Sequence, residues 1–282
     1  IMGTGRKLIM TIEQIRMLSF GGGVDSTALL AIHLDRDRAA AFLEMTREQL
    51  DEAFPLMEAV VFSDPGSEWP ETYLNIDYAR ERCEKAGVRF EVVRHHNTIY
   101  VHKEFDEMIE PARILNLIGK EGVSAPPKTY DKPVIIEGYD KPQRIRMIEK
   151  DWKALPKEEQ GNYTKRWLPY TIYEWLLDGG MLPLIPGGGG HTCSMRFKGS
   201  VQQDWADEEF PNATKMWSLG IELEEDERSE RFTANHPGEK WKGHEYDYPL
   251  QELKMGRQEC LDMLDHLGWD YRGDGSPVQK SS

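Results

Sequence analysis

The sequence is poor in cysteine. Its 282 residues include only Cys83, Cys193 and Cys260, which are far apart and odd in number. This count excludes a disulfide framework, and we expect a reducing, cytoplasmic compartment. There is no Cys-x-x-Cys pair either, so neither a zinc site nor an iron–sulfur cluster is expected.

Long apolar runs are also missing. A membrane helix needs about 18 consecutive apolar residues, and the nearest approach, 176–184, is broken by Asp178, two glycines and Pro183. The first residues lack the basic segment followed by an apolar one that is typical of a secretory signal. We therefore expect no membrane span, and we take residues 1–10 as a flexible start or remnant outside the fold.

Basic residues are fewer than acidic ones. The 35 Lys and Arg against 49 Asp and Glu give a net charge of −14. This balance disfavours sequence-independent binding of nucleic acid by the whole surface, although it leaves a local basic patch open. Apolar residues make up 39% and aromatic residues 10% of the chain, which is enough for a folded core despite a mean hydropathy of −0.62.

Strand and helix patterns alternate in the first half. Apolar runs at 15–20, 58–63 and 88–93 alternate with helical patterns at 26–34, 46–57 and 70–86. The alternation predicts an α/β fold with a doubly wound parallel sheet. Further helical patterns lie at 100–118, 142–152, 169–177 and 257–267, and one strand-like run at 134–136.

We expect three regions from this pattern. Residues 11–231 would form a nucleotide-binding domain, within which 122–161, rich in Pro, Lys and Asp, is an insertion or lid. Residues 232–282 would form a C-terminal extension. The four glycines at 187–190 predict a loop.

The most informative segment is a glycine loop between a strand and a helix. Gly21, Gly22 and Gly23 follow the apolar run, and Asp25 and Ser26 open the helix. Consecutive glycines let backbone N–H groups approach an anion, and the helix adds unpaired N–H groups and its dipole. The segment therefore predicts a phosphate site. Ser26 and Thr27 would add hydroxyl donors, and Asp25 would cap the helix or orient a magnesium ion; a plain glycine turn is the alternative.

Two common phosphate loops do not fit, since no Gly-Lys-Ser/Thr follows and the Gly-x-Gly-x-x-Gly fingerprint is absent. Residues 19–26 instead resemble the PP-loop, Ser-Gly-Gly-x-Asp-Ser, of the ATP pyrophosphatases, with Gly21 in the place of its usual serine. The resemblance implies a fold like that of the adenine nucleotide α-hydrolases. It also implies that Asp25 contacts magnesium. The residues that it implies contact ATP are Ser19, Phe20, Gly21, Gly22, Gly23 and Ser26.

A second segment narrows the resemblance. Residues 60–72 are similar to the Asp-Thr-Gly-x-Glu-x-Pro-Glu-Thr region of phosphoadenylylsulfate (PAPS) reductase-like proteins, with Pro65 in place of threonine. The strand ends at Ser63 and Asp64, and α/β folds bind nucleotides at such strand ends. Both residues are therefore candidate nucleotide contacts; a bare turn with a helix cap at Pro70 is the alternative.

Two further matches, of which the second is weaker, add basic side chains to the candidate site. Residues 191–198 correspond to the segment that closes over the nucleotide in these proteins, which implies nucleotide contacts from Cys193 and Arg196 and a catalytic Lys198. Ordinary surface charge is the alternative, and for Cys193 either a persulfide carrier or a packing residue remains open. Residues 218–228 resemble a further region, implying that Arg228 or Arg231 reaches the α-phosphate, unless the acidic run is a solvated face.

The remaining thiol argues against reductase chemistry. PAPS reductases carry a carboxy-terminal Glu-Cys-Gly-Ile/Leu-His motif, whereas this chain has Cys260 followed by Leu261 and Asp262. The spacing of Leu261, Leu264 and Leu267 predicts a helix with a buried structural thiol. The histidines after the third strand, at 95, 96 and 102, are expected to have surface or capping roles.

The resemblance implies an enzyme. It would use magnesium and cleave ATP between the α and β phosphates, leaving AMP or an adenylylated acceptor. Similar proteins include the ATP pyrophosphatase subunits of DNA phosphorothioation systems. This similarity implies a cysteine desulfurase and other subunits as partners. The protein would then act on nucleic acid only indirectly, through these partners. The alternatives are a sulfonucleotide reductase, a sulfate adenylyltransferase subunit, or a non-catalytic ATP-sensing subunit.

Overall fold

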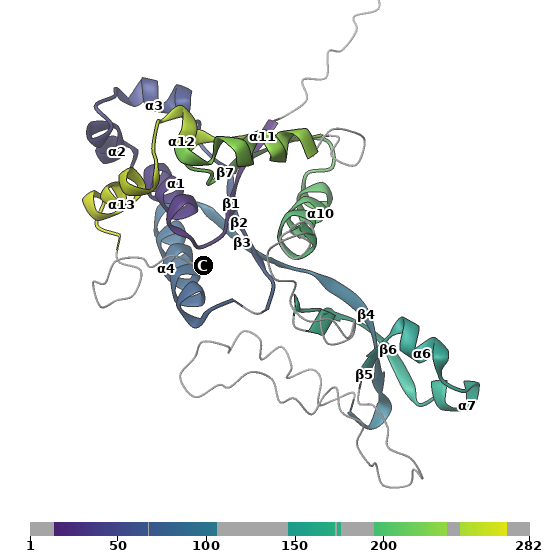
Figure 1. Ribbon diagram of the computed structural model, residues 1–282. Coiled ribbons are helices and arrows are strands. Elements are labelled where there is room, and N and C mark those ends of the chain that lie inside the picture. The colour runs from purple at the N-terminus through teal and green to yellow at the C-terminus, as the bar shows by residue number, and fades with distance from the viewer. Residues whose placement is uncertain are drawn as a thin grey trace, which may run out of the picture. The chain divides into compact units, whose positions relative to one another are not determined.

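The computed structural model describes residues 14–66, 68–105, 146–172, 174–175, 195–235 and 243–269 (Figure 1). The chain divides into two compact units. Unit 1 comprises residues 1–62, 78–91 and 203–282, and unit 2 comprises residues 63–77 and 92–202. No helix in the described ranges is long and apolar enough to cross a membrane.

A five-stranded sheet has the order β3–β2–β1–β7–β8. β1 pairs in parallel with β2 and with β7, and β7 pairs in parallel with β8. The strands are β1 (Gln14–Phe20), β2 (Ala59–Asp64), β3 (Arg89–Arg94), β7 (Thr214–Leu219) and β8 (His244–Asp247). The prediction of an α/β fold with a parallel sheet is confirmed. The chain runs from β1 to β2 and β3 on one side and later to β7 and β8 on the other, so the direction of winding changes between β1 and β7.

The central strands are buried because their sequences are almost continuously apolar. β1 places Ile15, Met17, Leu18 and Phe20 in the core, and all six residues of β2 are buried. Strands of a parallel sheet need such sequences because helices cover both of its faces.

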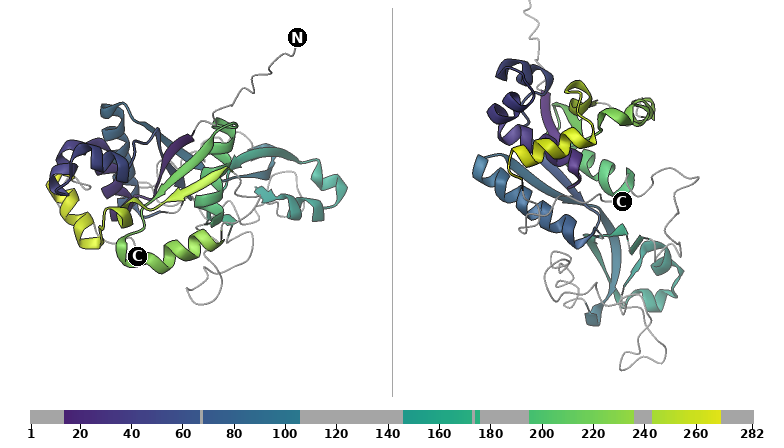
Figure 2. Two further views of the ribbon diagram at one scale, coloured as in Figure 1. Left: turned by 90° about the horizontal axis from the view of Figure 1, so that it is seen from above. Right: turned by 60° about the vertical axis from the view of Figure 1, so that its left-hand side comes forward.

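The main helix of unit 1, α1 (Val24–Leu34), is buried over almost its whole length. α13 (Arg257–His266) packs against both α1 and α2 (Arg36–Phe42), and α12 (Pro249–Glu252) also contacts α1. Figure 2 shows α13 alongside α1. Residues from the carboxy-terminal part of the chain thus complete the packing around the helix that follows the glycine loop.

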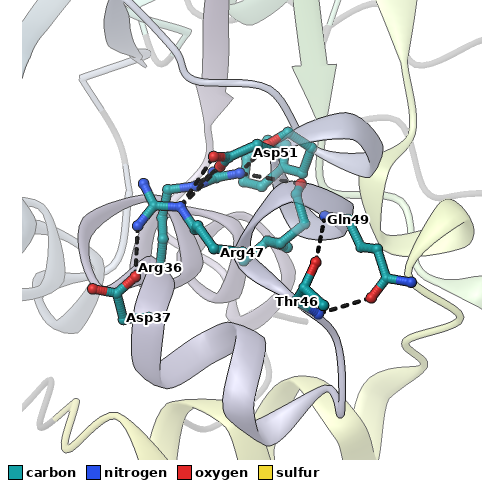
Figure 3. Close-up of polar contacts among 8 residues, drawn as sticks. Arg36, Asp37, Thr46, Arg47, Gln49 and Asp51 are labelled. Carbon is teal, nitrogen blue, oxygen red and sulfur yellow. Dashed lines mark hydrogen bonds and ion pairs between the residues drawn. The ribbon is translucent and has the colours of Figure 1, made fainter.

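Unit 1 also contains α3 (Arg47–Ala53), α11 (Asp226–Asn235) and a 3-10 turn η5 (Leu223–Glu225), and it shares α4 (Pro70–Ala86) and α10 (Ser200–Glu209) with unit 2. A capping box starts α3, in which Thr46 Oγ1 accepts from the Gln49 N–H and Gln49 Oε1 accepts from the Thr46 N–H (Figure 3). The buried Arg36 donates to Asp51 at 2.6 Å, and Arg47 also bonds Asp51. These contacts fix α2 against α3.

Unit 2 contains a second sheet, antiparallel, in the order β5–β4–β6 (Figure 1). The strands are β4 (His96–His102), β5 (Arg146–Ile148) and β6 (Tyr163–Pro169), and the connection from β5 to β6 holds α6 (Glu149–Ala154) and α7 (Lys157–Gln160). A 3-10 turn, η1 (Lys103–Phe105), follows β4. Ile99 and Val101 pack in one cluster with Tyr170 and Phe197. The second cluster consists of Tyr100, Met147 and Tyr163, with Trp152 and Leu155 against it.

This sheet corrects two helix predictions. The helix expected at 100–118 is wrong over Tyr100–His102, which belong to β4, and the helix expected at 142–152 is wrong over Arg146–Met147–Ile148, which form β5. The physical reason is tertiary pairing, because the partner of β4 lies some sixty residues later, where no local periodicity reports it. Of the insertion expected at 122–161, residues 146–161 belong to this sheet and its helices; 106–145, including the expected strand at 134–136, lie outside the described residues.

The remaining boundaries differ by a few residues. The helix expected at 46–57 ends at Ala53, and the helix expected at 257–267 ends at His266. The helix expected at 169–177 begins after Thr171, where the Thr171 hydroxyl accepts from the Glu174 N–H at 3.1 Å. The end of that helix and the glycine loop at 187–190 lie outside the described residues.

Candidate phosphate-binding site

The glycine loop lies at the carboxyl end of β1, the strand at which the sheet changes its winding direction. β1 ends at Phe20, Gly22 is buried with φ +73°, and Gly23 is the extended N-cap of α1. A positive φ is readily adopted only by glycine. In open α/β sheets this reversal point, flanked here by β2 and β7, is where ligands bind.

Four consecutive backbone donors of the loop lack a partner in the described part of the chain. The N–H groups of Gly22, Gly23, Val24 and Asp25 have no hydrogen-bond partner among the residues that the structure describes. The dipole of the 11-residue α1 adds positive potential at the same place. Unpaired N–H groups at a helix N-terminus form an anion site.

The hydroxyl groups predicted to contact phosphate serve the loop itself. Ser26 Oγ accepts from the Gly21 N–H at 3.2 Å and donates to the Gly23 carbonyl at 3.3 Å. Thr27 Oγ1 donates to that carbonyl at 2.7 Å, and Thr27 is fully buried. Ser26 and Thr27 therefore hold the loop in shape, and the backbone of the loop supplies the free donors.

A fourth glycine brings β7 against the loop. Gly220 follows β7, and a Cβ atom at this position would lie 2.7 Å from the Ser26 nitrogen and 3.0 Å from the Asp25 carbonyl carbon. Real Cβ atoms do not approach backbone so closely. The structure therefore gives a steric reason for the glycine in the fourth sequence match.

Asp25 lies in the first turn of α1 and does not cap the helix, so that part of the prediction is wrong. Its Oδ1 accepts from Arg257 Nη1 at 2.6 Å, with side-chain exposures of 19% for Asp25 and 28% for Arg257. The sequence interpretation missed Arg257. Its position in the first turn of the last helix offered no local signal, because its partner lies 232 residues away.

Glu222, just after Gly220, is a second carboxyl group beside Asp25. Burial raises the pKa of Glu222, and the negative charge of Asp25 raises it further. Its Oε2 is buried without a hydrogen-bond partner among the described residues. Magnesium prefers carboxylate oxygens and phosphate, so Asp25 and Glu222 suit an ion carried in with a phosphate group. A cluster of three or more His, Cys, Asp or Glu residues able to hold a metal by itself does not occur in the described ranges.

Both carboxylate oxygens of Asp64, in unit 2, accept hydrogen bonds. Its Oδ1 accepts from the Gly66 N–H and from the Tyr73 hydroxyl, both at 2.8 Å, and its Oδ2 accepts from Arg94 Nε at 2.9 Å. The side chain is 2% exposed. Burial and the neighbouring Asp64 raise the pKa of Tyr73 far above its usual value. In this conformation the Asp64 carboxylate is engaged by the turn after β2, by α4 and by β3.

The third sequence match lies against the end of β2 within unit 2. Ser63 Oγ donates to the Phe197 carbonyl at 2.6 Å. Lys198 Nζ pairs with Glu68 Oε1 at 2.7 Å, and the Arg196 guanidinium lies 5.4 Å from the centre of the Trp175 ring. These contacts hold Met195–Gly199, one turn of π-helix. Cys193 lies outside the described residues.

Arg228 lies in α11 and pairs with Glu225 at 2.8 Å, with its side chain 59% exposed. Arg231 donates to the Glu227 carbonyl. The structure thus pairs Arg228 with the acidic run that precedes it. It brings together Ser19, Phe20, Asp25, Ser26 and the three loop glycines in unit 1.

The two described cysteines are packing residues. Cys83 and Cys260 are both fully buried. Burial raises the pKa of Cys83 to about 12, and burial together with Asp25 and Glu222 raises the pKa of Cys260 further. Both thiols are therefore protonated at neutral pH, and Cys260 is the buried thiol that the helical pattern predicted.

A scan against protein-family models finds no match to this chain, and a search of the curated proteins finds none either.

Proposed function

We propose that this protein is an ATP pyrophosphatase of the PP-loop type with an adenine nucleotide α-hydrolase-like fold. The observation that carries the proposal is the row of four N–H groups, from Gly22 to Asp25, that find no partner among the described residues and lie at the reversal point of a parallel sheet. Such a row suits the β and γ phosphates of a nucleotide. The resemblance of residues 19–26 to the PP-loop supplies the expected reaction.

In this mechanism the loop donors and the α1 dipole bind the β and γ phosphates. An acceptor oxygen attacks the α phosphorus, the bond to the bridging oxygen breaks, and its electron pair leaves with pyrophosphate. With water as the acceptor the other product is AMP, and the proton of the water goes to solvent. Arg257 holds Asp25 in place, and donors fixed before the reaction stabilise charge without reorganisation.

Asp25 and Glu222 would hold magnesium together with the phosphates. When bound, the ion would neutralise the charge that develops on the leaving pyrophosphate. Lys198 and Arg228 are the catalytic cations that the resemblance implies. In the structure each is paired with a carboxylate, Lys198 with Glu68 and Arg228 with Glu225.

The substrate activated by ATP is proposed from the resemblance alone. An adenylylated acceptor carries a good leaving group for sulfur incorporation, as in DNA phosphorothioation, with a cysteine desulfurase and other subunits as partners. The buried Cys260 disfavours the alternative of a sulfonucleotide reductase, since a protonated thiol without solvent access is a poor nucleophile.

A non-catalytic ATP-sensing subunit is the second candidate. Gly21 stands where the PP-loop usually has serine, and the Ser26 hydroxyl is engaged within the loop. Both features remove hydroxyl donors from the phosphates while leaving the backbone donors free.

The test is to incubate the purified protein with ATP labelled on the α phosphate and magnesium, and to separate the products. We expect AMP and pyrophosphate, with turnover lowered at least tenfold by Asp25→Asn and by Glu222→Gln. The matched control is Asp37→Asn, an exposed carboxylate in the same unit, which should leave turnover unchanged. Formation of ADP and phosphate, or full turnover by Asp25→Asn, would refute the proposal; magnesium-dependent ATP binding without product would favour the sensing subunit.

A further inference from the structure

The ion pair of Asp25 and Arg257 joins the first turns of two helices. Asp25 lies in the first turn of α1, Arg257 is the first residue of α13, and Arg257 Nη1 donates to Asp25 Oδ1 at 2.6 Å. The N-terminus of a helix carries a positive partial charge, so both helix dipoles disfavour a guanidinium at this place. The cation at 257 is therefore explained by the carboxylate that it meets and not by the stability of α13.

The groups around this ion pair are acidic. Burial raises the pKa of Glu222, and the charge of Asp25 raises it further. Two more carboxylates, Glu225 and Glu224, act in the same direction, whereas the charge of Arg257 lowers this pKa. The Oε2 atom of Glu222 is buried without a hydrogen-bond partner in the described part of the chain. Arg257 thus offsets part of the negative charge that Asp25 and Glu222 bring to the glycine loop.

This balance of charge decides which ligand the loop accepts. Two ionised carboxylates repel a phosphate group and attract a free divalent cation, although the N–H groups of the same loop suit phosphate. The guanidinium cancels one of these two negative charges and occupies Asp25 Oδ1. A charge placed so that it repels one ligand and attracts another is a common source of specificity. Here the repelled ligand is a free cation and the attracted one is an anion.

We propose that Arg257 is a specificity-determining residue, which keeps free divalent cations away from Asp25 and Glu222 and admits magnesium only as its complex with a nucleoside triphosphate. Magnesium in proteins is commonly held by one or two carboxylates together with substrate phosphates. The described ranges contain no group of three or more His, Cys, Asp or Glu side chains able to hold the ion without phosphate. The inference rests on the proposed function for the nucleotide, and it adds the form in which nucleotide and ion reach the site.

A purely structural role for Arg257 is the alternative explanation. α13 packs against α1 and α2, and the buried side chains of α13 are those of Cys260, Met263 and Leu264. This packing does not involve the guanidinium, and a partly exposed ion pair adds little to stability. The two explanations predict different effects on binding. Lost packing would weaken the binding of every ligand at the loop, whereas a lost positive charge would strengthen the binding of a cation and weaken that of an anion.

The test is a pair of binding titrations of the full chain at about 0.15 M salt, where charges more than about 8 Å apart are largely screened. Mn²⁺ is titrated without nucleotide and the free ion is measured by electron paramagnetic resonance, and ATP is titrated in EDTA by calorimetry. Arg257→Gln should tighten Mn²⁺ binding about tenfold and weaken ATP binding about tenfold, because it removes one positive charge and keeps a hydrogen-bond donor. Arg257→Lys keeps the charge and should stay close to the wild type in both titrations.

Two further variants serve as controls. The double variant Asp25→Asn, Arg257→Gln should lose the gain in Mn²⁺ affinity, since this gain depends on the carboxylate of Asp25. Lys254→Gln removes an exposed positive charge three residues before Arg257, and it should change neither affinity more than about twofold. The thermal midpoints of all variants, measured in parallel, should match that of the wild type because the ion pair is partly exposed.

The inference would be overturned by equal Mn²⁺ affinity in the wild type and Arg257→Gln, by weaker binding of both ligands to Arg257→Gln, or by an equal gain in the Lys254→Gln control. A wild type that binds no ATP, with or without magnesium, would overturn it too. Failure of the proposed reaction is a separate result, because both titrations measure binding alone. A protein that shows the opposite shifts but forms no AMP would retain this inference and lose the enzymatic reaction.

Discussion

At the scale of single residues, the loop depends on close backbone approaches and on a balance of three charges. Gly22 supplies a left-handed conformation and Gly220 a space into which no Cβ fits. Asp25, Arg257 and Glu222 then place two carboxylates and one guanidinium at the end of β1 and β7. Backbone shape and charge can be tested separately.

Gly220→Ala tests the shape. The new Cβ would lie 2.7 Å from the Ser26 nitrogen, so α1 or the end of β7 must move. Overpacking of this kind costs about 1–3 kcal/mol, and the shifted donors should lose ATP affinity. Urea unfolding and ATP titration measure the two effects.

The control for this variant is Gly161→Ala, where φ is −65° and the nearest contact is an ordinary 3.8 Å. It should stay within about 0.5 kcal/mol of the wild type. If Gly220→Ala matched this control in both measurements, the close approach of β7 to α1 would be wrong.

Glu222→Gln tests the charge. The pKa of Glu222 is raised in the folded protein, so the folded state holds the proton of this carboxyl group more tightly than the unfolded state does. The free energy of unfolding that this preference adds is fully present below about pH 4.3, the ordinary pKa of glutamate. That contribution is lost as the pH rises through the raised folded value. We therefore expect Glu222→Gln to raise the urea midpoint at pH 7.5, with the gain shrinking towards pH 4. The exposed Glu224→Gln, next but one along the chain, is the comparison; a gain independent of pH would contradict this explanation.

At the scale of elements, the phosphate loop is supported by a helix from the other end of the chain. α13 packs against α1 and α2, and its Arg257 reaches Asp25. The Arg38 guanidinium also bonds backbone carbonyls at the end of α13. The orientation of α1, and hence of its N-terminal donors, therefore depends on α13.

Leu264→Ala tests this support. Leu264 is 3% exposed in α13, and removing such a buried side chain costs about 2–5 kcal/mol. Leu261→Ala, on the half-buried side of the same helix, should cost less. Urea denaturation of the two variants measures the difference. Equal losses would show that α13 does not pack on α1 by the face described.

At the scale of the whole molecule, the chain passes between its two units more than once. Unit 2 takes residues 63–77 from the first half of the chain and 92–202 from the middle. Residues 63–77 supply Asp64 to Arg94, Ser63 to Phe197 and Glu68 to Lys198. Unit 2 is thus built from two separate segments of the chain, and we expect its stability to depend on the shorter one.

Two fragments test this dependence. A fragment of residues 63–202 contains both members of each pair. A fragment of residues 92–202 lacks Asp64, the partner of Arg94, and Ser63, the partner of the Phe197 carbonyl. We expect the longer fragment to unfold cooperatively in thermal scans followed by circular dichroism and the shorter one to lack a sharp transition. A sharp transition in the shorter fragment would show that residues 63–77 are not needed.

Much of the parallel sheet could be predicted from the sequence because its signals are local. β1, α1, β2 and α4 each lie within a few residues of the expected bounds, since an unbroken apolar run or an amphipathic period is contained in the element itself. Pro70 begins α4 as a first-turn proline should. The antiparallel sheet of unit 2 was missed because a three-residue strand such as β5 carries no period of its own.

The sequence by itself determined the glycine loop, its place between a strand and a helix, and the α/β class, because these depend on conformational freedom and on patterns within about twenty residues. Only the tertiary structure decided which atoms serve the loop. It assigned the serine and threonine hydroxyls to the loop itself and brought Arg257 and Glu222 to Asp25. The physical reason is that these contacts join residues distant in the chain. The pattern of apolar and polar residues within one helix or strand carries no information about such distant partners.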